Sequence, residues 1–187
     1  MYDFVVVGAG PPGSRFAYQA ATAGYDVLLV EKGEVGRPLA CSGHVSTDIW
    51  EYLPAHAKDE LLQNHISGAR FHVAGPDSTA YPFFKSEPIS HVIDRVGLDK
   101  ALAERAVEAG AELWDQHTVV DVDEHPDRVD VTISPSDDQR VTVTARMVAG
   151  CDGPTSRVRQ SVGLAEPTEQ LHGVLAFTEN RGESLAL

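Results

Sequence analysis

Three glycines near the start of the chain have the spacing of a loop that cradles phosphate groups. In the segment "VVVGAGPPGSRFAYQA", Gly8, Gly10 and Gly13 follow a short apolar run and precede a helical pattern. The first glycine of such a loop permits a tight turn, the second admits a pyrophosphate, and the third lets the helix pack on the strand. Pro12 falls in the first helical turn, where its missing N–H costs nothing. With the positive end of the helix dipole, this spacing predicts a dinucleotide site.

A carboxylate at the end of the second predicted strand indicates which nucleotide this is. Glu31 ends the strand "YDVLLVE" and follows Gly13 by eighteen residues. A carboxylate there accepts hydrogen bonds from the 2′- and 3′-hydroxyls of an adenosine ribose and repels a 2′-phosphate. The nucleotide is therefore expected to be NAD or FAD rather than NADP, with Lys32 in the same site. The alternative is an ordinary solvated carboxylate at a strand end.

A βαβ unit is needed to bring the glycines and Glu31 together, and the sequence predicts one. Residues 2–7 are apolar and β-branched, as expected of a strand buried in a parallel sheet. A helical pattern over 13–23 stops at Gly24, and the strand over 25–31 completes the unit. This order of elements is typical of a doubly wound α/β domain.

The later segments predict how the rest of the domain is built. The sequence first predicts a loop rich in Gly and Pro, then a weak helix and an antiparallel pair of strands. These are followed by a strand, a strong helix ending at Gly110, a three-stranded meander, a buried strand and a last helix. The expected ranges are 32–46 for the loop, 47–62 for the weak helix, 66–75 and 78–84 for the pair, 95–109 for the strong helix, 117–124, 127–135 and 139–146 for the meander, and 147–153 for the buried strand.

Composition excludes several classes of function. The net charge of −13 disfavours nucleic-acid binding, and only four of the 15 basic residues are lysines. An acidic, Lys-poor composition resembles that of proteins from salt-loving archaea, although an ordinary acidic enzyme fits equally well. No apolar run approaches the ~20 residues of a membrane span, so a cytoplasmic protein is expected. The two cysteines, Cys41 and Cys151, are expected to be free thiols, and no metal site is expected.

Three segments together resemble the N-terminal part of a flavoprotein superfamily, the one containing para-hydroxybenzoate hydroxylase-type monooxygenases and geranylgeranyl reductases. The segments are "YDFVVVGAGPPGS" with "VEK", "DRVGLDKALAERAVEAGAEL" and "VAGCDGPTSRVR", which occur in the family's order. The resemblance implies FAD as the cofactor and places Arg95 near the flavin. The alternative for Arg95 is a surface ion pair with Asp94 or Asp99.

The same resemblance assigns further residues to the FAD site. Asp152, Gly153 and Ser156 match the segment that contacts the flavin side and is linked to reduction by a nicotinamide. An ordinary Asp-Gly turn is the alternative for the first two. Val119 lies on the strand that, in the family, covers the adenine through its backbone. Its side chain is expected to belong to the core, as is Cys151.

The loop "GRPLACSGHVS" indicates the branch of the family. Pro38, Cys41 and Gly43 match the "P-x-x-C-x-G" loop of geranylgeranyl reductases, whose cysteine lies beside the isoalloxazine ring, and Ser42 belongs to the same loop. Cys41 is the expected catalytic residue, as a proton donor or as a packing residue. His44 departs from the family pattern.

The resemblance therefore implies an oxidoreductase that reduces C=C bonds of geranylgeranyl chains by hydride transfer from reduced flavin. An isoprenoid lipid is the expected substrate, NAD(P)H or ferredoxin the electron donor, and the inner face of a membrane a peripheral contact. The alternatives are an aromatic-ring monooxygenase and a truncated nucleotide-binding fragment without turnover, because family members are longer. We expect one Rossmann-like FAD-binding domain over 1–187, incomplete at the C-terminus. In it, 66–93 forms an antiparallel substrate-side segment, 117–146 an inserted meander and 147–163 the return to the core.

Overall fold

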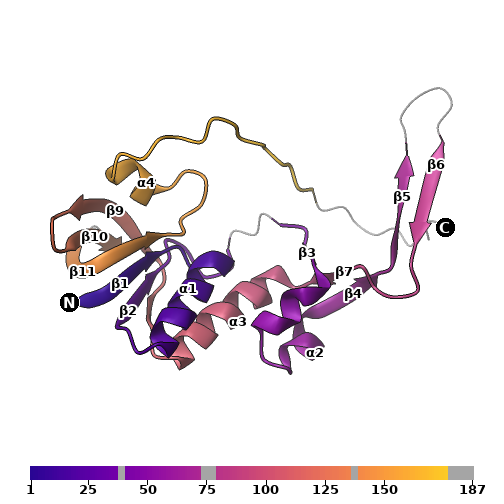
Figure 1. Cartoon of the computed structure of the whole chain (residues 1–187), viewed down its shortest axis with the longest axis horizontal. Helices are drawn as coiled ribbons and strands as arrows, with labels where there is room; N and C mark the ends of the chain where they lie inside the picture. The colour runs from indigo at the N-terminus through magenta and orange to yellow at the C-terminus, as the bar shows by residue number, and fades with distance from the viewer. Residues whose placement is uncertain (38–40, 73–78, 136–138, 177–187) are drawn as a thin grey trace.

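The computed structural model describes residues 1–37, 41–72, 79–135 and 139–176. Its elements alternate between strands and helices in the N-terminal part and are mostly strands afterwards (Figure 1). In chain order they are β1 (Tyr2–Val7), α1 (Pro11–Thr22), β2 (Val27–Val30), β3 (His44–Val45), the 3-10 helix η1 (Thr47–Tyr52), α2 (Ala57–Leu61), β4 (Leu62–Ile66), β5 (Gly68–His72), β6 (Ala80–Phe84), β7 (Ser90–Ile93), α3 (Arg95–Glu108), β8 (Glu112–Trp114), β9 (His117–Glu124), β10 (Val129–Pro135), β11 (Val141–Gly150) and α4 (Arg157–Ser161).

The main sheet has six strands in the order β8-β2-β1-β11-β10-β9. The four strands β8, β2, β1 and β11 pair in parallel, whereas β10 pairs antiparallel with both β11 and β9. Val5 and Val6 of β1 are fully buried although their side chains point to opposite faces. This explains why the first strand is a continuous apolar run, because a parallel sheet is covered on both faces. The predicted α/β fold class is confirmed.

Small side chains let the helices approach one face of this sheet. Helices α1 and α3 lie side by side (Figure 1), and their alanines share a core cluster with the strands. The other face is covered by β9, β10 and α4, which wrap over it and bury Val122, Val131 and Val158 against Leu28. The carboxyl ends of the parallel strands therefore meet at an edge that is flanked by helices on one side and by the meander on the other.

Strand β11 differs from the prediction of two separate strands over 139–146 and 147–153. It is one continuous ten-residue strand, whose first half pairs with β10 and whose second half pairs with β1. The reason lies in the sequence "VTVTARMVAG", which contains no turn residue between Arg146 and Met147. The meander is thus continuous with the main sheet through β11, while β9 and β10 fold over one face of the parallel strands.

Two further expectations were wrong in detail. The weak helix predicted over 47–62 is divided at Pro54 into η1 and α2, because proline disfavours the helical conformation in the residue before it. Its last residue, Leu62, already starts strand β4. The strands β3 and β8 were not predicted, because they contain only two and three residues and carry no detectable periodicity.

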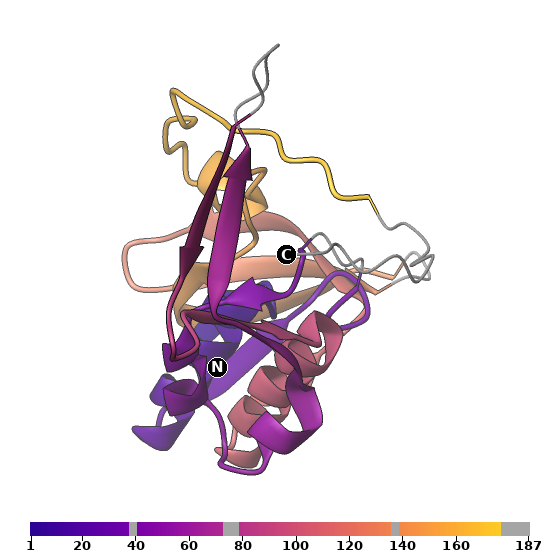
Figure 2. The same ribbon diagram turned by 90° about the vertical axis from the view of Figure 1, so that its right-hand side faces the viewer.

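The remaining strands form two smaller sheets. Strands β3, β7 and β4 form one, and β5 and β6 form a hairpin that projects away from the main sheet (Figures 1 and 2). The predicted antiparallel pair is confirmed, and the turn predicted between its strands, over 75–78, lies outside the described residues. Aromatic side chains of the hairpin, including Phe71 and Tyr81, are exposed. Within the described part of the chain, no helix has the length and apolar character needed to cross a membrane.

Candidate functional site

The three glycines of the first loop have different structural requirements. At Gly8, where φ is +99°, a Cβ atom would lie 2.5 Å from the carbonyl oxygen of Cys151. A Cβ at Gly13 would lie only 1.8 Å from the carbonyl oxygen of Gly8. At Gly10, by contrast, the nearest atom would be Cδ of Pro12 at 4.0 Å. Gly8 and Gly13 are therefore required for backbone packing, whereas Gly10 leaves open space in front of the loop.

The first turn of α1 limits which backbone groups can bind a phosphate. Pro11 and Pro12 occupy the first two helical positions and carry no N–H, so Gly13 is the first residue of the helix with a donor. The N–H of Ser14 already bonds to the carbonyl of Gly10 at 3.0 Å. Phosphate binding at this helix would therefore depend on few backbone donors.

The carboxylate of Glu31 links the glycine loop to the segment that follows β2 through two hydrogen bonds. Its Oε2 accepts a hydrogen bond from the N–H of Ala9 at 2.8 Å, and its Oε1 accepts one from the N–H of Gly33 at 3.1 Å. A carboxylate has about four acceptor positions, so both oxygens retain capacity for the two hydroxyls of a ribose. Glu31 can thus position the loop and bind the sugar.

A cavity of about 420 Å³ lies beside these residues, at the carboxyl ends of β1 and β2. Ligands of open α/β sheets bind at this edge. Seven of the residues predicted for the cofactor line the cavity: Gly8, Gly10, Glu31, Lys32, Val119, Asp152 and Gly153. Eight further lining residues were not predicted for the cofactor: Val7, Val30, His117, Thr118, Val120, Cys151, Thr155 and Arg157.

The residues that were not predicted are placed at the cavity for two different reasons. Thr155 and Arg157 follow Gly153 closely in the sequence, so the motif around Gly153 could have indicated them. His117 is placed by a backbone bond from its N–H to the carbonyl of Glu31, at 2.8 Å. This hydrogen bond joins residues that are far apart in the sequence, so no local sequence pattern predicts it.

Asp152 and Ser156 cap α4 with their side chains. The carboxylate of Asp152 accepts hydrogen bonds from Ser156 Oγ at 2.5 Å and from the N–H groups of Arg157 and Val158 at 2.6 and 3.2 Å. Ser156 Oγ in turn accepts one from the N–H of Arg159 at 3.0 Å. Ser156 is buried and is not among the residues that line the 420 Å³ cavity. Any contact of this turn with a nucleotide is therefore expected to use the exposed backbone around Gly153.

Arg95 connects the cysteine loop to the start of α3. One terminal nitrogen donates to Sγ of Cys41 at 3.6 Å, and the other pairs with Oδ1 of Asp99 at 2.6 Å. The side chains of Arg95 and Asp99 are only 16% and 13% exposed, so the pair considered from the sequence is not a surface pair. Asp94 instead caps the helix by accepting from the N–H of Val96. Burial raises the pKa of Asp99, and the Arg95 guanidinium opposes that rise.

The guanidinium of Arg95 also has one donor without an acceptor. Its Nε is buried and has no hydrogen-bond partner among the described residues. Buried donors are normally paired, so an acceptor from a bound molecule fits this position. Arg95, Cys41 and Asp99 therefore form a second group of polar side chains, and none of the three lines the 420 Å³ cavity.

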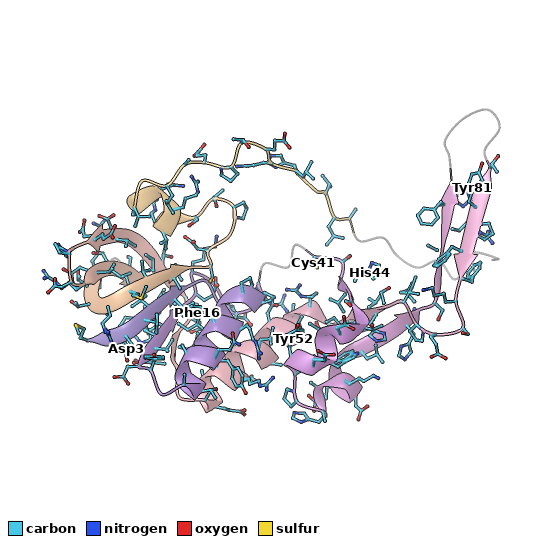
Figure 3. All side chains as sticks on the ribbon, viewed as in Figure 1. Asp3, Phe16, Cys41, His44, Tyr52 and Tyr81 are labelled. Carbon is cyan, nitrogen blue, oxygen red and sulfur yellow. The ribbon has the colours of Figure 1, made fainter. Side chains whose placement is uncertain are left out.

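The remaining residues of the cysteine loop have structural roles. Gly43 has a φ of +79°, and a Cβ there would lie 2.4 Å from the carbonyl oxygen of Ile93. Ser42 Oγ accepts from the N–H of His44 at 3.4 Å, and Nε2 of His44 lies 2.5 Å from Oγ of Ser90. Cys41 and His44, the first residue of β3, lie between the main sheet and the hairpin (Figure 3). Pro38 lies outside the described residues.

The fold and the cavity define a dinucleotide-binding α/β domain. Comparison with known proteins makes this more specific, because the family described as FAD binding domain matches residues 1–179. The chain belongs to this family, and the prediction of FAD as its cofactor is confirmed. Gly10, Glu31 and the unpartnered Nε of Arg95 are the features of this chain that fit such a ligand.

Curated relatives carry the name of a lipid reductase. Digeranylgeranylglycerophospholipid reductase 2 of Methanopyrus kandleri is 35% identical over 174 residues, which are 87% of this chain and 40% of that protein. Digeranylgeranylglycerophospholipid reductase of Thermoplasma acidophilum is 32% identical over 168 residues, which are 87% of this chain and 42% of that protein. The chain thus spans less than half the length of these relatives.

Solved structures share the fold. A geranylgeranyl bacteriochlorophyll reductase-like protein of Thermoplasma acidophilum has a TM-score of 0.67 and 30% identity, over 79% of this chain and 38% of that one. Halogenase PltM, crystallised with phloroglucinol and FAD, has a TM-score of 0.70 at 17% identity, over 87% of this chain and 36% of that one. The second likeness concerns the fold alone.

Proposed function

We propose that this chain is the FAD-binding portion of a reductase that hydrogenates C=C bonds of geranylgeranyl chains in an archaeal-type lipid. The contact between Arg95 and Cys41 carries the proposal. This contact places Cys41, from the loop that resembles those of geranylgeranyl reductases, against Arg95, the residue expected beside the flavin. The names of the 35% and 32% identical relatives support the same substrate class.

Residues of both groups have roles in this proposal. Glu31 binds the ribose hydroxyls, and Gly10 leaves room for the pyrophosphate while the cationic side chains of Lys32 and Arg157 balance its charge. Arg95 donates from Nε to the cofactor and from a terminal nitrogen to Cys41. FAD, when bound and reduced, supplies a hydride to one carbon of the double bond. Cys41 holds the proton that is added to the other carbon, so that one C=C bond gains two hydrogens.

The electron donor in this proposal is NAD(P)H or ferredoxin, and the enzyme contacts the membrane that contains its lipid substrate peripherally. An aromatic-ring monooxygenase is the second candidate. The observation in its favour is the likeness to OxyS anhydrotetracycline hydroxylase of Streptomyces rimosus, which has a TM-score of 0.68 at 25% identity, over 90% of this chain and 35% of that one. The third candidate is a nucleotide-binding fragment without turnover.

The test offers a geranylgeranyl lipid and a chemical reductant to the protein, produced with the whole of its reading frame, and follows the mass of the lipid. A gain of two hydrogens per double bond is expected. Cys41→Ser should slow this reaction at unchanged FAD content. Oxygen-dependent hydroxylation would contradict the proposal in favour of the monooxygenase, and FAD binding without any reduction would favour the fragment.

A further inference from the structure

The ion pair between Arg95 and Asp99 joins two side chains that lie one turn apart on α3. Nη2 of Arg95 lies 2.6 Å from Oδ1 of Asp99, and the side chains are only 16% and 13% exposed. No other ion pair among the described residues has two partners as little exposed. Withdrawing two charges from water is costly, and apolar side chains are often as stable in such a position. Stability alone therefore does not explain this pair.

The carboxylate of Asp99 and the guanidinium of Arg95 depend on each other for charge balance. Burial raises the pKa of Asp99, Arg95 opposes that rise through its charge and its hydrogen bond, and the charge of Glu31 adds to the rise. The carboxylate next to Arg95 in the sequence, Asp94, is exposed and accepts from the N–H of Val96 as the helix cap. Within the described part of the chain, Asp99 is thus the carboxylate that pairs with Arg95.

The same guanidinium is in contact with a thiol. Its Nη1 donates to Sγ of Cys41 at 3.6 Å, and no other charged side chain of the described residues hydrogen-bonds to this sulfur. Cys41 is a free cysteine and is partly exposed. A cation beside a cysteine favours the thiolate, which is a nucleophile but has no proton to give. An unpaired Arg95 would therefore work against a role of Cys41 as the holder of a proton.

We propose that Asp99 is a positioning residue that acts on Cys41 through Arg95. Its carboxylate cancels the charge of the guanidinium, so that the resting form of Cys41 is the thiol. It also fixes the direction of the guanidinium, because the acceptor of Nη2 belongs to the same helix as Arg95. This inference deepens the proposed function and rests on it for the use of the proton.

The shape of a guanidinium makes one anchor sufficient. Its five N–H donors lie in one plane in a fixed fork. Once Asp99 holds Nη2, the directions of the other donors are set. Nη1 reaches Sγ of Cys41, and the buried Nε keeps its N–H for an acceptor of a bound molecule. The anchor is firm, since Arg95 is the first residue of α3 and Asp99 lies one turn later in the same helix.

The proposed reduction requires the thiol and not the thiolate. When Cys41 protonates a substrate carbon, the S–H bond breaks and its electron pair stays on sulfur. The new C–H bond uses the electron pair of the C=C bond, whose other carbon takes the hydride. The thiolate that remains lies beside Nη1 of Arg95, which stabilises it until solvent returns the proton. Without Asp99, the guanidinium would hold Cys41 in the deprotonated form from the start.

The test follows the alkylation of Cys41 by iodoacetamide against pH, in the protein produced with the whole of its reading frame. Mass spectrometry of the peptide that contains Cys41 distinguishes it from other thiols. Asp99→Asn keeps an oxygen that can accept from Nη2 but removes the charge, so the midpoint of the alkylation rate should move by about one unit or more toward lower pH. Because a less basic thiolate is a weaker nucleophile, the rate should rise about threefold at pH 7 and fall about threefold at pH 10.

Two comparisons distinguish this effect of charge from a loosened loop. A loop that merely opens would raise the alkylation rate at every pH, including pH 10. The double variant with Arg95→Met and Asp99→Asn lacks both charges, so its midpoint should return to that of the unchanged protein. The control Glu104→Gln removes an exposed charge from the same helix and should leave the midpoint where it is. Circular dichroism checks that each variant is folded.

The inference would be overturned by an unchanged midpoint, or no reaction of Cys41 at all, in Asp99→Asn. A shift that persists in the double variant would overturn it as well. If Asp99→Asn does not fold, the double variant decides: a midpoint well above that of the unchanged protein would show that Arg95 is not neutralised there. Alkylation needs no turnover, so these results stand if the lipid is not reduced, and the lipid assay stands if they fail.

Discussion

Two alanine variants, Gly10→Ala and Gly13→Ala, should distinguish the glycine needed for ligand binding from the glycine needed for stability. A Cβ at Gly13 would lie 1.8 Å from the carbonyl oxygen of Gly8 and 3.2 Å from Cβ of Cys151. The first contact is far inside van der Waals distance, so α1 must move away from the loop. A Cβ at Gly10 meets no atom nearer than 4.0 Å, and the φ of −69° suits alanine. Gly13→Ala should therefore destabilise the fold, and Gly10→Ala should obstruct the space for the pyrophosphate.

The magnitudes follow from two opposing effects. Alanine is a better helix former than glycine by about 1 kcal/mol, which would favour Gly13→Ala in an exposed helix. Overpacking of this severity costs about 3 kcal/mol or more, so the clash dominates. A net loss of about 2 kcal/mol lowers the melting temperature of a domain of this size by roughly 4–8 °C. For Gly10→Ala we expect an unchanged melting temperature and at least a tenfold weaker binding of FAD, or about 1.4 kcal/mol.

Thermal unfolding followed by circular dichroism measures the first effect, and quenching of FAD fluorescence measures the second. Gly173→Ala is a control for an added methyl group alone, because the φ there is not positive and its Cβ would meet nothing within 4 Å. If Gly13→Ala has the same melting temperature as the unchanged protein, the helix does not pack on the loop as tightly as described. If Gly10→Ala binds FAD normally, the pyrophosphate does not pass in front of Gly10.

Two further perturbations test other parts of the molecule. Glu31→Ala should weaken FAD retention on purification and also lower the melting temperature of the free chain, because it removes the acceptor of the Ala9 N–H; unchanged retention would refute the ribose assignment. The pKa of His91 is lowered by burial, and His65 and Lys58 lower it further. The unfolded chain therefore takes up this proton first, and stability should fall as the pH drops below about 6.5. Melting curves between about pH 7.5 and 5.5 should show this loss, and His91→Gln should reduce it.

The sequence predicted the parts of the site that depend on local patterns. The glycine spacing and the carboxylate at the end of β2 are visible within thirty residues, and the structure brings them to one cavity. The helix over 95–109 was predicted nearly to the residue, because Asp94 caps its start and Gly110 follows its end with a φ of +109°. These features are determined by neighbours in the chain.

The parts that were missed depend on distant partners. The strands β3 and β8 exist only because β7 and β2 lie beside them. The placement of His117 depends on a backbone bond to Glu31, and no periodicity encodes it. A surface ion pair with Asp99 was the alternative for Arg95, and the structure instead places both side chains of this pair in a mostly buried position beside Cys41, a residue 54 positions away from Arg95 in the sequence.

The pairing of β11 with β1 has a consequence for synthesis of the protein. Asp3 and Arg146, which form an ion pair across these strands, are 143 positions apart in the sequence (Asp3 is labelled in Figure 3). During translation β1 can pair with β2 early, but its other side stays unpaired until residues 145–150 have left the ribosome. Such late closure slows folding and leaves an apolar strand available to wrong partners. A chaperone that binds extended apolar segments would therefore find a target in β1.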